Sequence, residues 1–465
     1  MSCEFSRLSA LEIAAGVRGR SFTAIAVVEA LLTRIESLNP SLNAYTHVAA
    51  GRALGEAAQV DLAISEGRDP GPLAGAPYSV KNLFDLEGVV TLAGSKINRE
   101  NAPAAEDATA VARLRAAGAV CLGAANMGEY AYDFVTINAH DGATRNPHDL
   151  SRSAGGSSGG SGASVAAGLC AFSLGTDTNG SVRVPASFCG VWGLKPTYGR
   201  LSRAGVFPFA ASLDTVGVLG RSVADLAQAM DAMSGPDPRD PACSQARFAP
   251  VEPFVDQGAA GLRIGVLTGY FEYGASSDVA AAVNAVAAGL GATERTELPR
   301  AELARAAAYL ITAAEGGELH RERLAARARD YDPGARDRFI AGALTPAAWY
   351  LHAQRFRAWW KSQMAEAFER FDVLVAPATP IAAPALDQQT FRFGETELPV
   401  RANIGLYTQP VTLIGLPVVA APVHAPGRLP VAVQLIGRPN GEVQLLQAAR
   451  VLEHAGVCAA PVVCG

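Results

Sequence analysis

The chain has 465 residues, of which 49% are hydrophobic and only 18% are charged. This balance is typical of a compact globular protein with a large core, and it excludes long disordered segments. The net charge of −5 is spread along the chain, without a run of lysine or arginine. Nucleic acid and anionic membrane surfaces are therefore not expected as direct partners.

The cysteines and the apolar segments indicate a cytoplasmic protein. The seven cysteines include no CxxC pair, so we expect neither a zinc knuckle nor a disulfide framework. Nowhere do 18 apolar residues follow one another, and the N-terminal segment contains Glu4, Arg7 and Glu12. The sequence therefore predicts neither a transmembrane helix nor a signal peptide.

Helical and extended patterns alternate from the start of the chain. Apolar residues at helical spacing predict a helix that begins after a Thr23 cap and ends at Asn39-Pro40. A second helix is predicted over residues 53–65. The apolar run 78–80 follows a proline- and glycine-rich turn, and it is predicted to be a strand that leads directly into Lys81.

One long stretch of small residues has two interpretations. Residues 151–162 are almost all serine, glycine and alanine, which is the composition of a flexible linker. The stretch leads, however, into an apolar helix at 163–171 and a strand-like run at 172–175. Because it is embedded between core elements, we predict that it belongs to the core.

Two further helices show capping signals. Asp107 is expected to cap the helix that follows it. Ser222 and Asp225 form a capping-box pattern, with aspartate in place of glutamate, at the start of a helix that extends to about Ser234. The proline- and aspartate-rich stretch 235–257 then marks a junction between subdomains.

The C-terminal half continues the alternation. Helices are predicted at 301–329, 346–371 and 442–453. Strand-like runs lie at 262–266, 373–376, 417–422 and 431–436. Strands that alternate with helices predict an α/β protein.

Three separated segments supply what an amide-cleaving serine needs: a base, donors for the oxyanion and an acid for the leaving nitrogen. Ser181 follows the turn 178–180, whose backbone N–H groups can converge on an oxyanion. Lys81 ends a buried strand, and burial lowers the pKa of a lysine until the neutral amine acts as a base. Ser157, in the glycine-rich turn, is placed to relay the proton.

Each of these residues has a commoner structural role when it is taken alone. A lysine after a strand usually lies at the surface, a Gly/Ser turn is usually a loop, and Ser181 would cap a helix. The catalytic interpretation is favoured because the three segments complement one another in one mechanism.

The two glycine-rich blocks resemble those of the amidase signature family. The family's GGSSGGS block is matched by Gly155–Ser161, and its GTDxxGSxRxPA block by Gly175–Ala186. The resemblance implies an α/β amidase signature fold, with a large mixed and twisted β-sheet covered by helices on both faces. It also implies that Lys81 is the base, Ser157 the cis-serine and Ser181 the acylated nucleophile. No metal and no organic cofactor is implied.

By the same resemblance, residues 1–465 form a single amidase signature domain. The signature core is expected at about 60–230, and an insertion of helices and strands at about 258–370. Residues from about 371 to 465 are expected to return to the core sheet.

Residues close to Ser181 receive more specific roles. The oxyanion hole is expected to consist of the backbone N–H groups of Thr178, Asn179, Gly180 and Ser181. Asp177 and Arg183 flank this turn. For this pair, an ion pair that fixes the loop is favoured over a role in orienting the substrate.

Substrate contacts are predicted at Ser158, His148 and Arg338. Ser158 also fits GxSxG, the nucleophile elbow of α/β-hydrolases, but the turn-like residues before it argue against that elbow. We expect Ser158 instead to hydrogen-bond within the site. Arg338 is the candidate clamp for a substrate carboxylate. The alternative for Arg338, and for Arg336, is a solvated position on a charged helix face.

Two departures from the commoner family pattern narrow the substrate. Asn179 stands where many relatives have glycine, and its side chain is expected to add a donor beside the turn and to narrow the pocket. His148 stands where tryptophan is commoner. Both features resemble the carboxybiuret hydrolases of s-triazine breakdown, which implies a small, polar, anionic amide that loses ammonia.

Three alternatives to that function stay open. The first is the glutaminase component of a tRNA-dependent amidotransferase, and the second is a general aliphatic or aryl amidase. The third is an inactive binding protein on the same scaffold. The expected partners are a small-molecule amide substrate and further subunits, because the alanine-rich helices and the family resemblance are compatible with an oligomer that includes a small helical accessory subunit.

Overall fold

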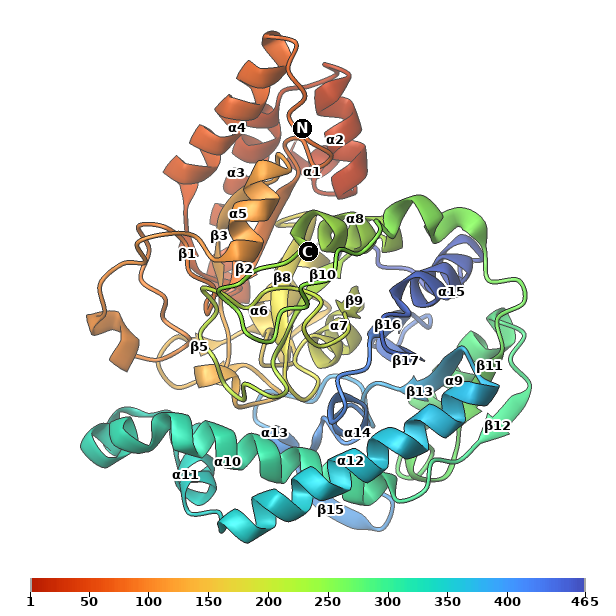
Figure 1. Ribbon diagram of the computed structural model, residues 1–465. Coiled ribbons are helices and arrows are strands. Elements are labelled where there is room, and N and C mark those ends of the chain that lie inside the picture. Colours follow the sequence, from red (N-terminus) through yellow and green to blue (C-terminus); the bar gives the residue numbers. More distant parts are fainter. Residues whose placement is uncertain (1, 464–465) are drawn as a thin grey trace.

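The computed structural model describes residues 2–463 and is built around one β-sheet of eleven strands (Figure 1). In spatial order the strands are β1 (Tyr45–Val48), β3 (Val120–Ala125), β2 (Pro77–Lys81), β8 (Phe172–Asp177), β10 (Thr215–Gly220), β9 (Trp192–Lys195), β16 (Val418–Val423), β17 (Val431–Gly437), β13 (Val373–Pro377), β11 (Ile264–Leu267) and β12 (Glu294–Thr296). Parallel pairs lie toward both edges, and the strands between them are antiparallel. The predicted α/β fold with a large mixed sheet is confirmed.

Three small two-stranded sheets lie outside this main sheet. They are formed by β4 (Ile137–Asn138) with β5 (Gly142–Ala143), β6 (Arg145–Asn146) with β7 (Asp149–Ser153), and β14 (Thr390–Phe393) with β15 (Thr396–Pro399).

The helices come from all parts of the chain. They are α1 (Ser2–Phe5), α2 (Ala10–Arg18), α3 (Ala24–Leu42), α4 (Ala50–Ser65), α5 (Thr109–Ala116), α6 (Gly159–Ala166), α7 (Arg183–Cys189), α8 (Val223–Met233), α9 (Ser277–Gly289), α10 (Ala301–Arg327), α11 (Pro333–Ala343), α12 (Ala347–Arg370), α13 (Val400–Asn403), α14 (Gln409–Thr412) and α15 (Glu442–His454). Within residues 2–463, none of them combines the length and the apolar character that a membrane crossing requires.

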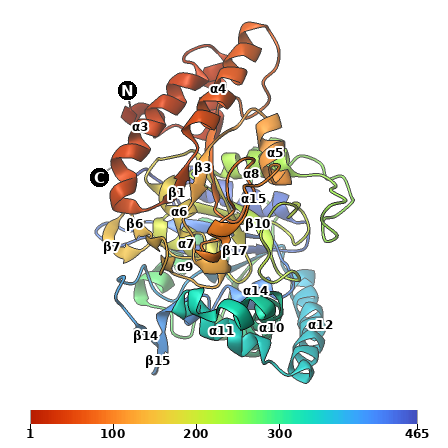
Figure 2. The same ribbon diagram turned by 90° about the vertical axis from the view of Figure 1, so that its left-hand side faces the viewer.

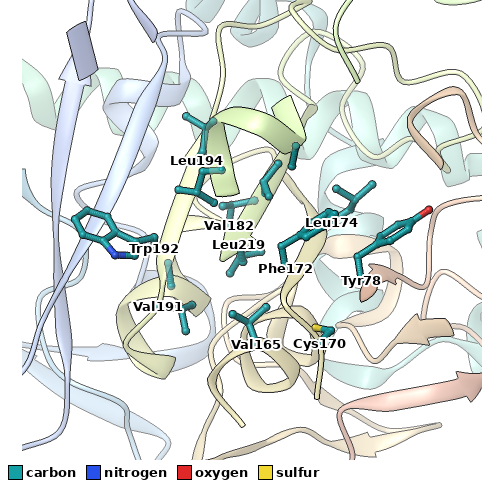
Figure 3. Close-up of a cluster of buried hydrophobic side chains, with 14 of the residues drawn as sticks. Tyr78, Val165, Cys170, Phe172, Leu174, Val182, Val191, Trp192, Leu194 and Leu219 are labelled. Atoms are coloured by element: carbon teal, nitrogen blue, oxygen red, sulfur yellow. The ribbon is translucent and has the colours of Figure 1, made fainter. Parts of the chain in front are cut away.

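Helices cover both faces of the sheet near its centre. A Cβ atom on Gly217 of β10 would lie 2.9 Å from Val182, which directly precedes α7. Leu219 of β10 belongs to the same cluster as Val182 (Figure 3). Gly220 instead faces Leu226 of α8. Because successive strand residues alternate in direction, α7 and α8 lie on opposite faces.

Hydrophobic side chains fix the central strands on both faces of the sheet. Phe172 and Leu174 of β8 and Trp192 of β9 point to the same face as Gly220, which α8 covers, whereas Leu219 of β10 points to the opposite face. Figure 3 shows these residues with Val165 of α6. All five side chains are fully buried, and each large apolar side chain so buried stabilises the fold by about 1.5–3 kcal/mol. The carboxyl end of β8 therefore has a rigid support.

Three helices of the C-terminal half form a separate group. α10 packs against both α11 and α12. In both views, this group lies at the end of the molecule opposite α3 and α4 (Figures 1 and 2).

The first long helix passes through a proline. The predicted end at Asn39-Pro40 is wrong, because α3 continues to Leu42. A proline in the last turn removes a single helical hydrogen bond. The C-cap residue is Asn43, which is left-handed (φ 52°) and donates its N–H to the Asn39 carbonyl at 2.7 Å. The Thr23 cap is confirmed, since its side chain accepts from the Ala26 N–H.

Asp107 does not cap α5. Ala108 occupies the cap position, and the Asp107 carboxylate accepts from the Arg52 guanidinium at 2.6 and 2.9 Å. It also accepts from the Glu87 N–H at 2.9 Å. A bidentate hydrogen bond between oppositely charged groups is stronger than a single cap hydrogen bond. The Asp107 carboxylate therefore pairs with Arg52 instead of capping α5.

The glycine- and serine-rich stretch is confirmed as part of the core. α6 begins inside it, at Gly159, and every residue of this helix is buried. The helix ends at Ala166, earlier than predicted. β8 then begins at Phe172, as predicted.

Most of the other predicted elements are present, with small shifts at their ends. The predicted helices at 53–65, 301–329, 346–371 and 442–453 correspond to α4, α10, α12 and α15, and the four C-terminal strand-like runs to β11, β13, β16 and β17. The sequence did not predict α2, α9 and α11. These helices are rich in alanine and glycine, which blurs the contrast between an apolar and a polar face.

The predicted capping box at the start of α8 is absent. Ser222 makes no side-chain cap bond. Asp225 reaches instead to the start of α2, where its carboxylate accepts from the N–H groups of Ala10 at 2.8 Å and Leu11 at 3.1 Å. Glu453 of α15 accepts from the first N–H of α8. A carboxylate at a helix N-terminus is favourable whichever part of the chain supplies it.

Replacing Asp225 with alanine is expected to lower the free energy of unfolding by about 1–2 kcal/mol. The reason is that two N–H groups at the start of α2 lose their acceptor. Urea denaturation followed by circular dichroism measures the change. Gln228→Ala, at a half-buried position of the same helix, is the matched control, with an expected change below about 0.5 kcal/mol. Equal losses in both variants would contradict the cap.

Candidate active site

The carboxyl ends of two parallel strands bring Lys81 and Thr176 together. Val80 of β2 lies opposite Leu174 of β8. Lys81 Nζ lies 2.8 Å from Ser157 Oγ and 2.9 Å from Thr176 Oγ1, and it is hydrogen-bonded to both. All three side chains are buried. The predicted base and the predicted relay serine are therefore in direct contact.

The buried amine of Lys81 loses its proton easily. Burial lowers the pKa of Lys81 to about 7, although the carboxylates of Asp133, Asp214 and Asp177 favour the ammonium form. The neutral amine is therefore accessible at neutral pH. A neutral amine can accept a proton from Ser157.

A second lysine is buried nearby. Lys195 is the last residue of β9, and burial together with the Arg183 charge lowers its pKa to about 7 as well. Its Nζ donates to the carbonyl of Pro196 at 3.0 Å. Because two lysines titrate over the same range, a pH profile alone does not distinguish them.

Ser157 is held in a tight, buried turn. The peptide bond between Gly156 and Ser157 is cis, in agreement with the cis-serine that the family resemblance implied. Glycine is required before it, because a Cβ on Gly156 would lie 2.5 Å from the backbone nitrogen of Val135. The Ser157 carbonyl accepts from the Gly128 N–H at 3.2 Å.

Ser181 lies on the loop that connects β8 to α7. Its side chain is only 3% exposed. Within residues 2–463, no hydrogen bond connects the Ser181 hydroxyl to another group, Ser157 included. The proton relay from Ser181 to Ser157 therefore stays a prediction.

A buried ion pair fixes the loop around Ser181. Arg183 donates to Asp177 through Nε at 2.9 Å and Nη2 at 2.8 Å, and both side chains are fully buried. Burial opposes ionisation of Asp177, but the Arg183 charge outweighs it and holds the pKa of the carboxyl below its usual value. Asp177 also accepts from the Gly180 N–H at 2.7 Å. These contacts agree with the loop-fixing role that the sequence favoured.

Three of the four predicted oxyanion donors are free. In the part of the chain that the structure describes, the backbone N–H groups of Thr178, Asn179 and Ser181 donate to no protein acceptor. Gly180 differs, because its N–H donates to Asp177. An ionised carboxylate is a strong acceptor, so the predicted set of donors is corrected from four to three.

Ser158 does not present its hydroxyl to a substrate. The side chain is fully buried. Its Oγ donates to the Thr176 carbonyl at 3.3 Å and accepts from the Thr176 N–H at 3.4 Å. The predicted substrate contact is therefore corrected: Ser158 joins the glycine-rich turn to β8, because a buried hydroxyl must find its partners inside the protein.

His148 lies at the far end of α7 from Ser181. Its Nε2 is 3.1 Å from the carbonyl of Cys189, the last residue of α7. Its ring packs against His424, with 5.6 Å between the ring centroids. The 7 residues of α7 span about 10 Å. The predicted substrate contact at His148 is therefore wrong, and the imidazole instead binds a free carbonyl at a helix end.

Of the two candidate arginines on α11, only Arg338 turns inward. Arg336 pairs with Asp337 at 2.7 Å at the surface. Arg338 Nη1 donates to the Tyr132 carbonyl at 2.6 Å, and the guanidinium lies 3.8 Å from the centroid of the Tyr132 ring. Its Nε is buried and has no hydrogen-bond partner within residues 2–463. Arg338 therefore keeps a free donor.

Tyr132 and Asn179 both lie against α10, and Tyr132 also contacts Arg338. Burial raises the pKa of Tyr132, and the neighbouring phenol of Tyr309 adds to this effect while Arg338 opposes it. Asn179 Nδ2 donates to Thr312 Oγ1 at 2.8 Å. Tyr309 and Thr312 are three positions apart on α10, so they are neighbours on its surface.

Sequence reasoning missed two residues of this region, Thr176 and Asp214. Thr176 stands inside the glycine-rich block, so its place beside Lys81 follows once the two strands pair. Asp214 carried no signal in the sequence. It accepts from the Thr178 hydroxyl at 2.6 Å and from the Phe209 N–H at 2.8 Å. These residues line a cavity of about 140 Å³.

Comparisons with known proteins agree with these motifs. The amidase family model matches residues 26–446. AtzE, a 1-carboxybiuret hydrolase subunit of Pseudomonas sp. (strain ADP), is 52% identical to this chain. The match covers 97% of this chain and 99% of that protein. A glutamyl-tRNA(Gln) amidotransferase subunit from Anaeromyxobacter dehalogenans (strain 2CP-C) is 40% identical, over 97% of this chain and 96% of that protein.

Solved structures have the same fold. One of them is the structure of an s-triazine catabolic enzyme, described with an unexpected vestigial protein complex that reveals its evolutionary origins. It matches with a TM-score of 0.96 and 51% identity, over 97% of this chain and 100% of that one. A glutamyl-tRNA(Gln) amidotransferase subunit from Thermotoga maritima matches with a TM-score of 0.81 and 30% identity, over 99% of both chains. The chain therefore belongs to the amidase signature family and is an amidohydrolase.

Proposed function

We propose that the protein removes ammonia from 1-carboxybiuret by hydrolysing a C–N amide bond. The observation that carries this proposal is two buried polar atoms without hydrogen-bond partners within residues 2–463: Asn179 Oδ1, on the turn before Ser181, and Arg338 Nε, against the Tyr132 ring. Buried polar atoms require hydrogen-bond partners, so the pair suits a small substrate rich in N–H, carbonyl and carboxylate groups. The 52% identity to a protein of a 1-carboxybiuret hydrolase supports the same substrate.

Arg338 is the proposed clamp for the substrate carboxylate. Its Nη1 is occupied by the Tyr132 carbonyl, whereas its buried Nε is free. A charge-assisted bond from Nε to a carboxylate would satisfy both groups. The Tyr132 ring beneath the guanidinium holds the charge in place.

In the proposed mechanism, neutral Lys81 takes a proton from Ser157 while Ser157 takes one from Ser181. The Ser181 oxygen attacks the amide carbonyl and forms an acyl-enzyme. The free N–H groups of Thr178, Asn179 and Ser181 stabilise the oxyanion. The proton then passes to the departing nitrogen, ammonia leaves, and water hydrolyses the acyl-enzyme by the same relay.

We also propose that the chain assembles into an oligomer with a small helical accessory subunit. One solved relative is described together with a vestigial protein complex. Between α11 and the first turns of α12, this chain exposes Leu344 (76%), Trp349 (59%) and Leu351 (59%). These large apolar side chains are exposed within one short stretch of the chain, and exposed apolar surface is typical of an interaction site. The cytoplasmic location stays a prediction from the sequence.

Ammonia release from 1-carboxybiuret, biuret, glutamine and simple aliphatic and aryl amides tests the substrate. We expect kcat/KM for 1-carboxybiuret to exceed the others by about 100-fold or more, because it alone combines a carboxylate with an N–H group on each side of its carbonyl groups. Preference for glutamine or for a plain amide would contradict the proposed substrate while leaving the family intact.

Ser181→Ala is expected to reduce this turnover by about 10⁴-fold or more, because the nucleophile is lost, and to leave the circular dichroism spectrum unchanged. Ser164→Ala, at another buried serine on α6, is the matched control and should keep most of the activity. Undiminished turnover by Ser181→Ala would exclude Ser181 as the nucleophile.

The acidic side of the pH profile is expected to report Lys81. Below pH 7, kcat/KM should rise about tenfold per pH unit and then level off, because the neutral amine is the base and the pKa of Lys81 is about 7. Initial rates at substrate concentrations well below KM, from about pH 5 to 9, measure the midpoint.

Thr176→Val assigns this midpoint to Lys81 rather than to Lys195. Thr176 Oγ1 accepts from the ammonium form of Lys81, so its loss disfavours the charged form and moves the midpoint to lower pH. Thr176→Ser keeps the hydroxyl and should leave the midpoint in place. A midpoint that does not move in Thr176→Val would mean that another group titrates.

Light scattering of the purified full chain tests the assembly. We expect a mass above the 48.1 kDa of one chain, and a lower mass after Trp349→Glu and Leu351→Glu, because charge is unfavourable in an apolar interface. Leu62→Glu on α4, where the side chain is 44% exposed, is the matched control and should not change the mass. A single-chain mass for the unmodified protein would contradict self-association.

A further inference from the structure

We infer that Asn179 determines substrate specificity by accepting a hydrogen bond from an N–H group beside the scissile carbonyl. This inference rests on the proposed site and names the chemical feature that the site recognises: a ureido or biuret nitrogen, in contrast to the CH₂ of an ordinary amide.

The orientation of the Asn179 amide follows from its partner on α10. Thr312 has one hydroxyl proton, and it donates this proton to the Ala308 carbonyl at 2.8 Å. The Thr312 oxygen can then only accept from Asn179. The atom of Asn179 that lies 2.8 Å from Thr312 Oγ1 is therefore the donor Nδ2.

This orientation reverses the role that the sequence suggested for Asn179. The side chain was expected to offer a donor beside the oxyanion turn, but Nδ2 points to α10, where one of its two N–H groups donates to Thr312. The acceptor Oδ1 points the other way. It is buried and has no hydrogen-bond partner within the described residues.

The backbone holds the acceptor in place. The Asn179 carbonyl accepts from Thr408 Oγ1 at 2.5 Å, and only 7% of Asn179 is exposed. With both its backbone and its amide anchored, Asn179 cannot turn Oδ1 toward solvent. Asn179 belongs to the turn whose free N–H groups are the proposed oxyanion donors and stands two residues before Ser181, and on this ground we place Oδ1 beside the substrate.

The chemical consequence is discrimination between N–H and CH₂. In a biuret-type substrate, the atom next to the scissile carbonyl is a nitrogen that carries a proton, and it can donate to Oδ1. In glutamine or an aliphatic amide the same position is a CH₂ group, which leaves Oδ1 buried and unpaired. A site built to bind an N–H strongly rejects an analogue that lacks it.

Biuret and malonamide form the matched pair of ligands for the test, because they differ only in a central N–H or CH₂. Their binding to the full-length Ser181→Ala protein is measured by isothermal titration calorimetry. We expect biuret to bind about tenfold or more tightly than malonamide. In the Asn179→Ala, Ser181→Ala double variant, the ratio of the two dissociation constants should fall close to one.

Thr312 provides the second pair of variants, in the same Ser181→Ala background. Thr312→Val removes the group that fixes the amide, so the preference for biuret should decrease. Thr312→Ser keeps the hydroxyl and should retain the preference. An unchanged ratio in Asn179→Ala, or the absence of biuret binding to the Ser181→Ala parent, would overturn the inference.

Binding and turnover fail independently in this design. If 1-carboxybiuret releases no ammonia but the preference for N–H depends on Asn179, the proposed substrate is wrong and the acceptor role holds. If 1-carboxybiuret is the substrate but the preference does not depend on Asn179, only the inference about Asn179 is lost.

Discussion

The site depends on a lysine amine that is buried without a contacting carboxylate. Lys81 Nζ has only the hydroxyl groups of Ser157 and Thr176 as partners within residues 2–463, so burial prevails and its pKa falls to about 7. The nearby carboxylates are bound elsewhere: Asp133 to Arg401, Asp177 to Arg183 and Asp214 to the Thr178 hydroxyl. If one of them contacted Lys81 directly, the ammonium form would be favoured and the proposed base would be lost. Much of the polar network around the site therefore keeps negative charge away from this amine.

The Asp177–Arg183 pair is hydrogen-bonded to the C-terminal part of the chain. Arg183 Nη1 donates to Gln434 of β17 at 2.7 Å and to the Thr408 carbonyl at 3.1 Å. Removal of one partner from a buried ion pair costs about 3–5 kcal/mol, so the loop before α7 is firmly anchored. β17, which joins the sheet late in the sequence, thus helps to hold the loop that contains Ser181.

In the proposed mechanism, α10 contributes to substrate recognition and not to the acid–base chemistry. The glycine-rich blocks supply Ser157 and Ser181, whereas α10 supplies Tyr309 and Thr312, which orient Tyr132 and Asn179. A change on α10 can therefore alter which amide is bound without altering the relay.

The sequence by itself determined the elements and contacts that depend on local pattern. The strand that ends at Lys81, the long C-terminal helices and the two glycine-rich blocks were predictable, because periodicity and turn composition act over a few residues. Only the tertiary structure decided where single polar groups find their partners. Asp107, Asp225, Ser158 and His148 all bind groups that local pattern does not indicate. The same holds for Asn179, whose donor and acceptor ends are distinguished only by Thr312, far away in the sequence. A buried polar group forms hydrogen bonds with the strongest partners close to it, and only the folded chain determines which groups lie close enough.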